Sequence, residues 1–253
     1  MSTNNNNINN NSDIHSIHNN NNNKRSSHYS ARSGVIALLL LGVSCFSAMP
    51  SISALASPAA RKVVVFGGTG FVGSAVCERL VKKGYNVVGL SRRGTNPKPG
   101  DEYLDQVKWV VGDALNKNTV KEVVKDADAV VHAVGLLFDV ESGLDNLNTF
   151  VSGSGSLPGD DSTYDNITRK TMFNVVEAVE AKSNFFSKNK KTPLCFVSCA
   201  EAGWPDVALG PQVEEYLAPD WLRKYLKAKR SVETRLNESK GIRPVIFRPS
   251  LIW

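Results

Sequence analysis

A cluster of glycines between an apolar run and a helix-forming segment is the feature that most constrains the fold of this chain. Val63–Phe66 has the pattern of a short buried strand, and Phe71–Lys83 that of a helix, with Gly67, Gly70 and Gly73 at their junction. In a strand–turn–helix unit, glycines at this spacing permit a tight turn, bring the backbone close to a pyrophosphate and let the helix pack on the strand. The alternative is a glycine-rich turn that holds no ligand.

The glycine turn predicts a cradle for a dinucleotide. A helix that begins here offers free N–H groups and the positive end of its dipole to the phosphates. The residues expected to contact the pyrophosphate are Gly67, Thr69, Gly70, Phe71, Val72 and Gly73.

Apolar runs continue to alternate with helix-like segments along the rest of the chain. The expected strands are Val63–Phe66, Asn86–Leu90, Val107–Val111, Ala129–Ala133, Leu194–Ser198 and Pro244–Arg248. The expected helices are Phe71–Lys83, Thr119–Lys125, Thr163–Lys182 and Trp221–Ser239. Strands rich in Val, Ile and Leu and separated by helices indicate a parallel sheet covered on both faces. We therefore expect one α/β domain over residues 61–253, with the doubly wound parallel sheet of the Rossmann fold and ligands at the carboxyl ends of its strands.

The end of the second expected strand bears on cofactor choice. NAD-selective sites place an acidic residue there, which holds the ribose 2′-hydroxyl. This chain has Ser91, Arg92 and Arg93 instead. Because guanidinium groups pair with phosphate in bidentate geometry, these residues favour NADP(H) over NAD(H). The alternative is that the two arginines belong to a solvated turn.

Two further turns contribute candidate cofactor contacts. Asp113, after the third strand, is placed to accept a hydrogen bond from the adenine amino group. Ala133, Val134 and Gly135, after the fourth strand, present small residues to the cofactor. The polar connection Gly135–Ser162 that follows is long for a compact domain, and such connections are usually functional or disordered. It is expected to border the nicotinamide side of the cleft.

Tyr225 and Lys229 lie one helical turn apart, in the segment between the fifth and sixth strands. An ammonium group at this spacing lowers the pKa of the phenol and holds the ribose, so that the tyrosine acts as a general acid or base. The segment is rich in Lys and Arg, and a solvated helix face is the competing interpretation.

The first 60 residues do not have the pattern of a folded core. Asn-rich tracts within residues 4–23 are low-complexity and polar, so they bury too little apolar surface to become ordered. A basic, Ser-rich stretch, the apolar run Val35–Phe46 and the small residues Ala54–Ala56 follow, which is typical of a targeting segment. A mitochondrial presequence, a signal peptide with a plastid transit peptide, and an uncleaved hydrophobic anchor remain the alternatives.

Charge and cysteine usage exclude several classes of function. The formal net charge is +6, of which the leader contributes two, and this mild excess does not indicate a nucleic-acid surface. Cys45, Cys77, Cys195 and Cys199 show no metal-binding or redox spacing, so no metal site is expected. His132 lies within an apolar strand, which favours a buried structural role.

The chain stops soon after the sixth strand, with Pro249–Trp253. All six strands needed to close a nucleotide site are present, whereas a segment that shapes a substrate pocket is missing from this sequence. We expect either a fragment whose substrate-side C-terminal part is truncated, which we favour, or a very reduced pocket.

The glycine turn at residues 67–73, together with Tyr225 and Lys229, resembles the short-chain dehydrogenase/reductase superfamily over residues 61–253. The glycine spacing is similar to that of its extended and atypical branches, as is Arg248-Pro249 after the sixth strand. The resemblance implies that the tyrosine is the acid/base, that the lysine binds the ribose, and that a Ser or Thr just after the fifth strand polarises the substrate oxygen.

In this chain the place of that hydroxyl is taken by Ser198-Cys199-Ala200. The equivalent position is Cys199 or Ala200, with Ser198 still inside the strand, which leaves Ser198 as the only nearby hydroxyl to carry that catalytic role. The lack of a hydroxyl at the expected point argues against catalysis, because it removes a donor for the developing oxyanion.

Within the superfamily, residues 131–137, 163–165, 198–200 and 229–233 are similar to the atypical group of the 39 kDa subunit of respiratory complex I and of a mitochondrial member associated with coenzyme Q synthesis. Plastid proteins share the pattern. The resemblance implies an organellar NAD(P)-binding protein, with a quinone-synthesis or respiratory membrane complex as partner, peripheral membrane association and no nucleic acid.

Three functional hypotheses follow. The first is an accessory protein that binds the dinucleotide as a structural or sensing ligand and assists quinone-lipid metabolism. The second is an active NADPH-dependent reductase or epimerase that uses Tyr225 and Lys229. The third is a scaffold whose glycine turn is idle.

Overall fold

The structure is a computed structural model that describes residues 60–148, 159–186 and 191–250. All but the last residue of the expected leader 1–60, the middle of the Gly135–Ser162 connection and the last three residues of the chain lie outside these ranges.

The core of the described chain is one parallel sheet of six strands in the order β3-β2-β1-β4-β5-β6. The strands are β1 (Lys62–Phe66), β2 (Asn86–Ser91), β3 (Lys108–Val111), β4 (Ala129–His132), β5 (Thr192–Val197) and β6 (Ile242–Phe247). The predicted doubly wound Rossmann sheet is therefore confirmed, and all six strands that the sequence predicted exist. The chain first builds outward from β1 to β3 and then crosses back to β4, so the strand order reverses between β1 and β4.

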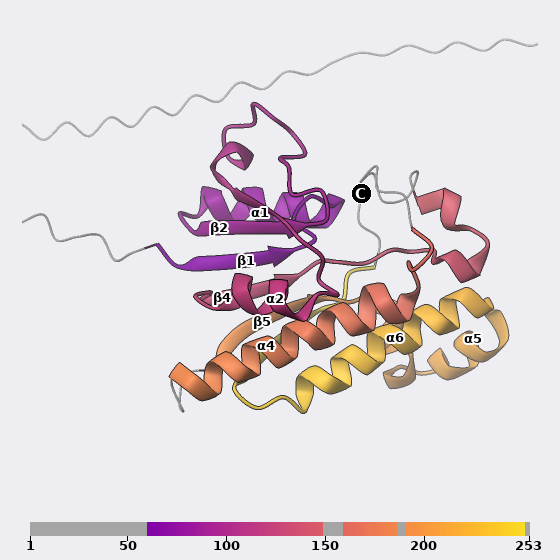
Figure 1. The fold of residues 1–253 in the computed structure, drawn as a ribbon. Helices are drawn as coiled ribbons and strands as arrows, with labels where there is room; N and C mark the ends of the chain where they lie inside the picture. The colour runs from indigo at the N-terminus through magenta and orange to yellow at the C-terminus, as the bar shows by residue number, and fades with distance from the viewer. Residues whose placement is uncertain (1–59, 149–158, 187–190, 251–253) are drawn as a thin grey trace, which may run out of the picture. The chain divides into compact units, whose positions relative to one another are not determined.

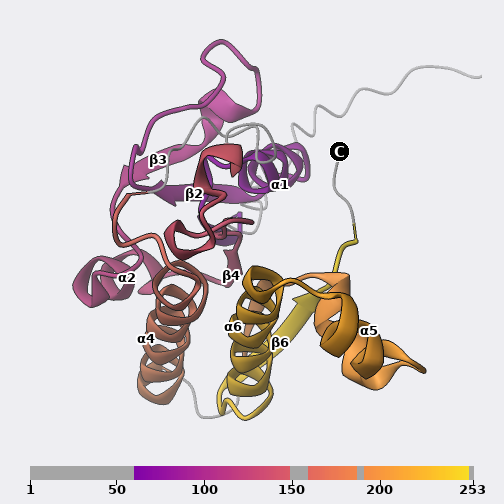
Figure 2. The same ribbon diagram turned by 90° about the vertical axis from the view of Figure 1, so that its right-hand side faces the viewer.

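Helices cover both faces of this sheet (Figure 1). The α-helices are α1 (Phe71–Lys82), α2 (Lys117–Val124), α4 (Thr171–Phe186), α5 (Gly210–Leu217) and α6 (Asp220–Asn237). The shorter helical elements are η1 (Leu104–Gln106), η2 (Val140–Ser142), η3 (Asp145–Leu147), the π-helix η4 (Asp165–Lys170) and η5 (Ala200–Asp206). Figure 2 shows α4 and α6 side by side on the face opposite α1.

The alternation of side chains along β1 assigns each face its partner helices. Val64 and Phe66 belong to the larger apolar cluster, which α2, α4 and α6 complete. Val63 and Val65 point to the other face and pack with Cys77 of α1 and with η1. Every one of these strand residues is buried, so β1 reads as a continuous apolar run.

The structure corrects several predicted boundaries. The predicted helix Thr163–Lys182 is a π-helix followed by α4, which ends at Phe186. β5 begins two residues earlier than predicted and ends at Val197, so Ser198 follows the strand and is not part of it. The segment between β5 and α6, for which no element was predicted, contains η5 and α5.

Candidate dinucleotide-binding site

The carboxyl ends of β1 and β4 meet where the strand order reverses, which is the point at which doubly wound sheets bind ligands. Gly67 follows β1 with φ +77°, a conformation that favours glycine. A Cβ on Gly67 would lie 2.9 Å from the carbonyl carbon and oxygen of Ala133, which follows β4. The two strand ends are therefore in contact through the glycine, and no larger residue fits there.

The remaining glycines of the turn have different roles. A Cβ on Gly73 would lie 2.0 Å from the carbonyl oxygen of Gly67, so α1 packs against the turn only because residue 73 has no side chain. A Cβ on Gly70 would meet only the Gly67 oxygen, at 3.2 Å, although Gly70 lines a cavity. The glycine at 73 therefore serves packing, and the glycine at 70 keeps space open for a ligand.

The first turn of α1 has the properties of an anion site. It contains no acidic residue, and Gly70, which precedes it, offers no side chain to cap the helix. Its first amides are therefore left to face a ligand, with the positive end of the helix dipole behind them. These features fit a pyrophosphate group.

A cavity of about 550 Å³ opens beside this turn. Of the residues predicted to bind the cofactor, those that line it are Gly67, Thr69, Gly70, Ser91, Arg92, Arg93, Asp113, Ala133, Val134 and Gly135. The other predicted cofactor residues are Phe71, Val72 and Gly73, which form the start of α1, and Lys229 of α6. A cavity of this size and lining suits an extended nucleotide.

The turn after β2 carries the two arginines to the rim of the cavity. The Ser91 hydroxyl accepts a hydrogen bond from the amide of Gly94 at 2.9 Å, which closes the turn around Arg92 and Arg93. Both arginines are exposed. Asp113, across the cavity, accepts a hydrogen bond from the amide of Leu115 through one carboxylate oxygen, at 2.8 Å.

The cavity is also lined by residues that the sequence analysis missed. They are Leu90, Gly112, Ala114, Leu115, Leu136, Asn148, Gly159, Asp160, Asp161, Ser162, Ile167 and Thr171. Asn148 is buried and bonds both the amide and the carbonyl of Phe138, which fixes the start of the long connection. Ile167 lies in the π-helix, an element that is frequent at functional sites, and Thr171 follows directly.

His132, at the end of β4, is fully buried, as the sequence predicted. Its Nε2 lies 3.0 Å from the Thr171 hydroxyl, which donates to the Ile167 carbonyl at 2.6 Å. Since that hydroxyl proton is used, Nε2 is the donor to the hydroxyl oxygen and carries the ring proton. Burial, followed by the charge of Lys229, lowers the pKa of His132 to about 3, so the imidazole is neutral.

Tyr225 and Lys229 lie together on α6, and neither is among the described residues that line the cavity. The Lys229 ammonium lies 5.3 Å from the centroid of the Tyr225 ring and donates to the Val197 carbonyl at 2.8 Å. It also comes within 3.8 Å of where a Cβ on Gly135 would be, so it lies next to a residue that lines the cavity. Burial lowers the pKa of Lys229 to about 8, and the charges of Cys199 and Glu233 oppose this shift.

The Tyr225 side chain is partly buried and packs on a small apolar cluster. Its ring makes an edge contact with the Tyr164 ring, 5.5 Å away between centroids. Burial raises the pKa of the phenol well above its usual range, and the neighbouring Cys199 and Glu201 add to the effect. The Cys199 thiol, whose own pKa burial also raises, therefore lies beside the phenol at the position where the resemblance implied a hydroxyl.

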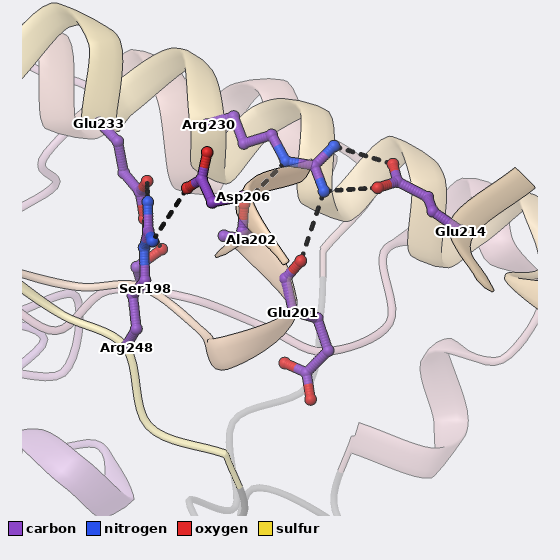
Figure 3. Close-up of polar contacts among 8 residues, drawn as sticks. All are labelled: Ser198, Glu201, Ala202, Asp206, Glu214, Arg230, Glu233 and Arg248. Atoms are coloured by element: carbon purple, nitrogen blue, oxygen red, sulfur yellow. Dashed lines mark hydrogen bonds and ion pairs between the residues drawn. The ribbon is translucent and has the colours of Figure 1, made fainter. Parts of the chain in front are cut away.

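The Ser198 side chain points toward Glu233 of α6. Its hydroxyl is buried and donates to Oε1 of Glu233 at 2.5 Å (Figure 3). The predicted catalytic hydroxyl is thus committed to a carboxylate on α6, and Ser198 does not line the cavity formed by the described residues. Figure 3 also shows Arg230 of α6 tied to Glu214 of α5, which holds the segment after β5 in place.

The described part of the chain has neither a metal-binding cluster nor a membrane-spanning helix. Within residues 60–148, 159–186 and 191–250, no group of three or more His, Cys, Asp and Glu side chains is arranged to hold a metal ion. No helix in those ranges is long and apolar enough to cross a bilayer.

Comparison with known proteins identifies relatives of two kinds. MIOREX complex component 2 of Saccharomyces cerevisiae is 27% identical over 218 residues, which is 76% of this chain and 73% of that protein. An uncharacterized chloroplastic protein of Arabidopsis thaliana, At1g32220, is 44% identical over 94 residues, or 37% of this chain and 31% of its own length.

Solved structures share the fold. A Bacillus halodurans chain described as an NAD-dependent epimerase/dehydratase has a TM-score of 0.50 and is 23% identical, over 75% of this chain and 70% of its own. The Bordetella bronchiseptica enzyme WbmF, solved with NAD+, also has a TM-score of 0.50 and is 16% identical, over 74% of this chain and 49% of its own. Finally, residues 63–252 match the model of the NAD dependent epimerase/dehydratase family. The chain belongs to that family, and is by this membership an NAD(P)-binding protein.

Proposed function

We propose that this protein is an organellar dinucleotide-binding accessory protein, in which NADP(H) is held as a structural or sensing ligand and not consumed. Residues 61–253 would form the binding domain, and residues 1–60 would target it. Its partner would be a quinone-synthesis or respiratory membrane complex, with which it associates peripherally.

One observation carries this proposal. The glycine turn lines a cavity, whereas Tyr225 and Ser198, the two side chains needed to process a substrate, are not among the described residues that line it. The Tyr225 phenol packs beside Tyr164 and Cys199, and its pKa is raised by burial, not lowered as a general base requires. The Ser198 hydroxyl is used by Glu233. Such a site is suited to hold a dinucleotide more than to transform a second molecule.

The relatives support an organellar location and assembly into a complex. One is a component of the MIOREX complex, and another is chloroplastic. We favour the mitochondrion, with a plastid reached through a signal and transit peptide as the alternative. The link to quinone lipids comes from the similarity of residues 131–137 and 229–233 to the coenzyme Q-associated group.

The cofactor preference gives the first prediction. Replacing Arg92 and Arg93 together by glutamine is expected to weaken NADPH binding by about tenfold or more, because each charge-assisted contact to a phosphate contributes about 1.5–3 kcal/mol. NADH has no 2′-phosphate, so its affinity should change by less than about twofold. Isothermal titration with both dinucleotides measures the two changes. Equal losses for NADPH and NADH would contradict the preference.

Removing the Tyr225 hydroxyl tests the accessory role. In the Tyr225→Phe variant, saturating NADPH is expected to raise the thermal midpoint by about 5–10 °C, as in the wild type, since binding at 100-fold excess over Kd contributes about 2.7 kcal/mol. The variant should also rescue a deletion strain as well as the wild type does. Tyr164→Phe, which removes another mostly buried phenol, is the matched control. Loss of rescue by Tyr225→Phe alone, at normal protein level, would contradict the accessory role.

An active reductase or epimerase is the second candidate, favoured by the position of Lys229 beside both Tyr225 and Gly135. In a reductase, bound NADPH would supply a hydride to a carbonyl carbon of a quinone- or isoprenoid-like substrate. Tyr225 would give its phenolic proton to the carbonyl oxygen and regain one from solvent, leaving an alcohol and NADP+. Lys229 would hold the ribose. The rescue experiment separates the two candidates.

A further inference from the structure

Two successive turns of α6 bind the end of β5 through side chains on one face of the helix. Tyr225, Lys229 and Glu233 are spaced four residues apart, so they lie on the same face of the helix. Lys229 donates to the carbonyl of Val197, the last residue of β5, and Glu233 accepts from the hydroxyl of Ser198, the next residue. The position of the Lys229 ammonium therefore depends on how α6 is held one turn further along.

Glu233 has a buried carboxylate, and a buried charge needs partners. The residue is only 5% exposed. Arg248, just after β6, binds it through two nitrogens, with Nη2–Oε2 at 2.6 Å and Nε–Oε1 at 3.1 Å (Figure 3). With the Ser198 hydroxyl, both carboxylate oxygens are occupied, as a buried charge requires. Glu233 thus joins the ends of β5 and β6 to α6.

The backbone extends the same junction. The amide of Ser198 donates to the carbonyl of Phe247 at 2.8 Å, and the amide of Ala200 donates to that of Pro249 at 2.8 Å. The pairing of β5 with β6 therefore continues past the strands, up to the residues that Glu233 and Arg248 clamp. The two segments that bind Glu233 are therefore held to each other by backbone hydrogen bonds.

We propose that Glu233 is a positioning residue: through Ser198 and Arg248 it fixes the turn of α6 that carries Lys229, and so places the Lys229 ammonium beside Gly135 at the edge of the cavity. The inference rests on the proposed function in one respect, since Lys229 matters only if a dinucleotide occupies the cavity. The role of Glu233 can be tested apart from the proposed function, because it concerns what holds the lysine and not what the lysine binds.

The positioning role of Glu233 has a measurable consequence, because the charged groups around Lys229 affect the pKa of its ammonium group. The groups that face it are Cys199, Tyr225, His132 and Glu233. Burial keeps the thiol and the phenol protonated by raising their pKa values, and the imidazole is neutral. Glu233, as the partner of Arg248, is the carboxylate among them. Cys199 and Glu233 both oppose the burial that lowers the pKa of Lys229, and Glu233 does so as a carboxylate.

The test replaces Glu233 by glutamine in the full chain, which keeps the shape of the side chain and removes the charge. We expect Lys229 to lose its proton about one pH unit lower than in the wild type, which is a tenfold change in the protonation equilibrium. NMR of the lysine side chains in the nucleotide-free protein measures this midpoint, and the Lys229→Arg variant identifies the signal. NADPH affinity at about pH 8 should then fall by up to tenfold, with a change below about twofold at pH 6.5.

Glu214→Gln is the matched control, because it removes another carboxylate that is paired with an arginine of α6, here Arg230. It should leave the Lys229 midpoint unchanged. Ser198→Ala removes only the hydroxyl that holds Glu233, so it should shift the midpoint in the same direction by a smaller amount. It also serves if Glu233→Gln does not fold.

Two outcomes are decisive against the inference. An unchanged Lys229 midpoint in Ser198→Ala and in folded Glu233→Gln would overturn it, as would an equal shift in Glu214→Gln. If the wild type bound neither dinucleotide, the proposed function would fail, while the nucleotide-free titration would still decide the role of Glu233.

Discussion

Replacing Gly70 by valine is expected to abolish the binding of both NADPH and NADH while the protein stays folded. The backbone at this position is extended, with φ −75° and ψ 171°, which valine adopts readily. The new Cβ would require a shift of only a few tenths of an ångström from the Gly67 carbonyl oxygen, at 3.2 Å. The side chain would, however, fill the space through which the backbone approaches a pyrophosphate.

Titration calorimetry should show Kd values at least about 100-fold weaker, equivalent to about 2.7 kcal/mol. The thermal midpoint of the variant should remain near that of the wild type and no longer respond to NADPH. Gly84→Asn is a suitable control, since Gly84 has positive φ and open space around it, beyond the C-terminal end of α1. If Gly70→Val still bound either dinucleotide within tenfold of the wild type, the cradle would not lie where the structure indicates.

Replacing Gly73 by valine is expected to prevent folding. Its Cβ would lie 2.0 Å from the oxygen and 2.8 Å from the carbon of the Gly67 carbonyl. Because these are backbone atoms, no side-chain rotation relieves the clash, and α1 must move away from β1. The apolar cluster around Cys77 and Val65 would open as a result.

Even Gly73→Ala should cost about 3 kcal/mol, typical of an overpacked interior. For a chain of this size, that corresponds to a thermal midpoint lower by about 6–12 °C. Circular dichroism during heating measures it, and Gly70→Ala, at the neighbouring glycine, should be nearly neutral for stability. A Gly73→Ala variant as stable as the wild type would mean that α1 does not pack as described.

The parts of the fold that the sequence predicted are those determined by local patterns. Buried strands such as Val63–Phe66 consist of consecutive apolar residues, and the glycine turn has its own spacing. By contrast, η5 and α5 were not predicted, because Gly203, Pro205 and Gly210 read locally as breaks. What holds this segment is distant in sequence: Arg230 bonds the Ala202 carbonyl at 3.0 Å and pairs with Glu214.

The cavity residues also divide into those that the local sequence predicts and those that depend on the tertiary structure. Residues at the carboxyl ends of strands or just beyond them, such as Ser91 and Asp113, were predicted because the carboxyl end of a strand is a fixed place in this fold. Asn148 was missed, since its position depends on its hydrogen bonds to the backbone of Phe138. Thr171 was missed because it follows a π-helix that no local pattern predicted. Ser198 was predicted as a candidate hydroxyl, and only the tertiary structure shows its bond to Glu233.

The turn after β1 is held by hydrogen bonds of its own backbone and of β2. The amides of Gly67 and Gly68 donate to the Leu90 carbonyl at 2.9 and 3.2 Å, and the Gly70 amide donates to the Gly67 carbonyl at 2.9 Å. A dinucleotide would therefore meet a preorganised surface, and little conformational entropy would be lost when this loop engages it. At free nucleotide concentrations near its Kd, the occupancy of such a site would change with the nucleotide level of its compartment.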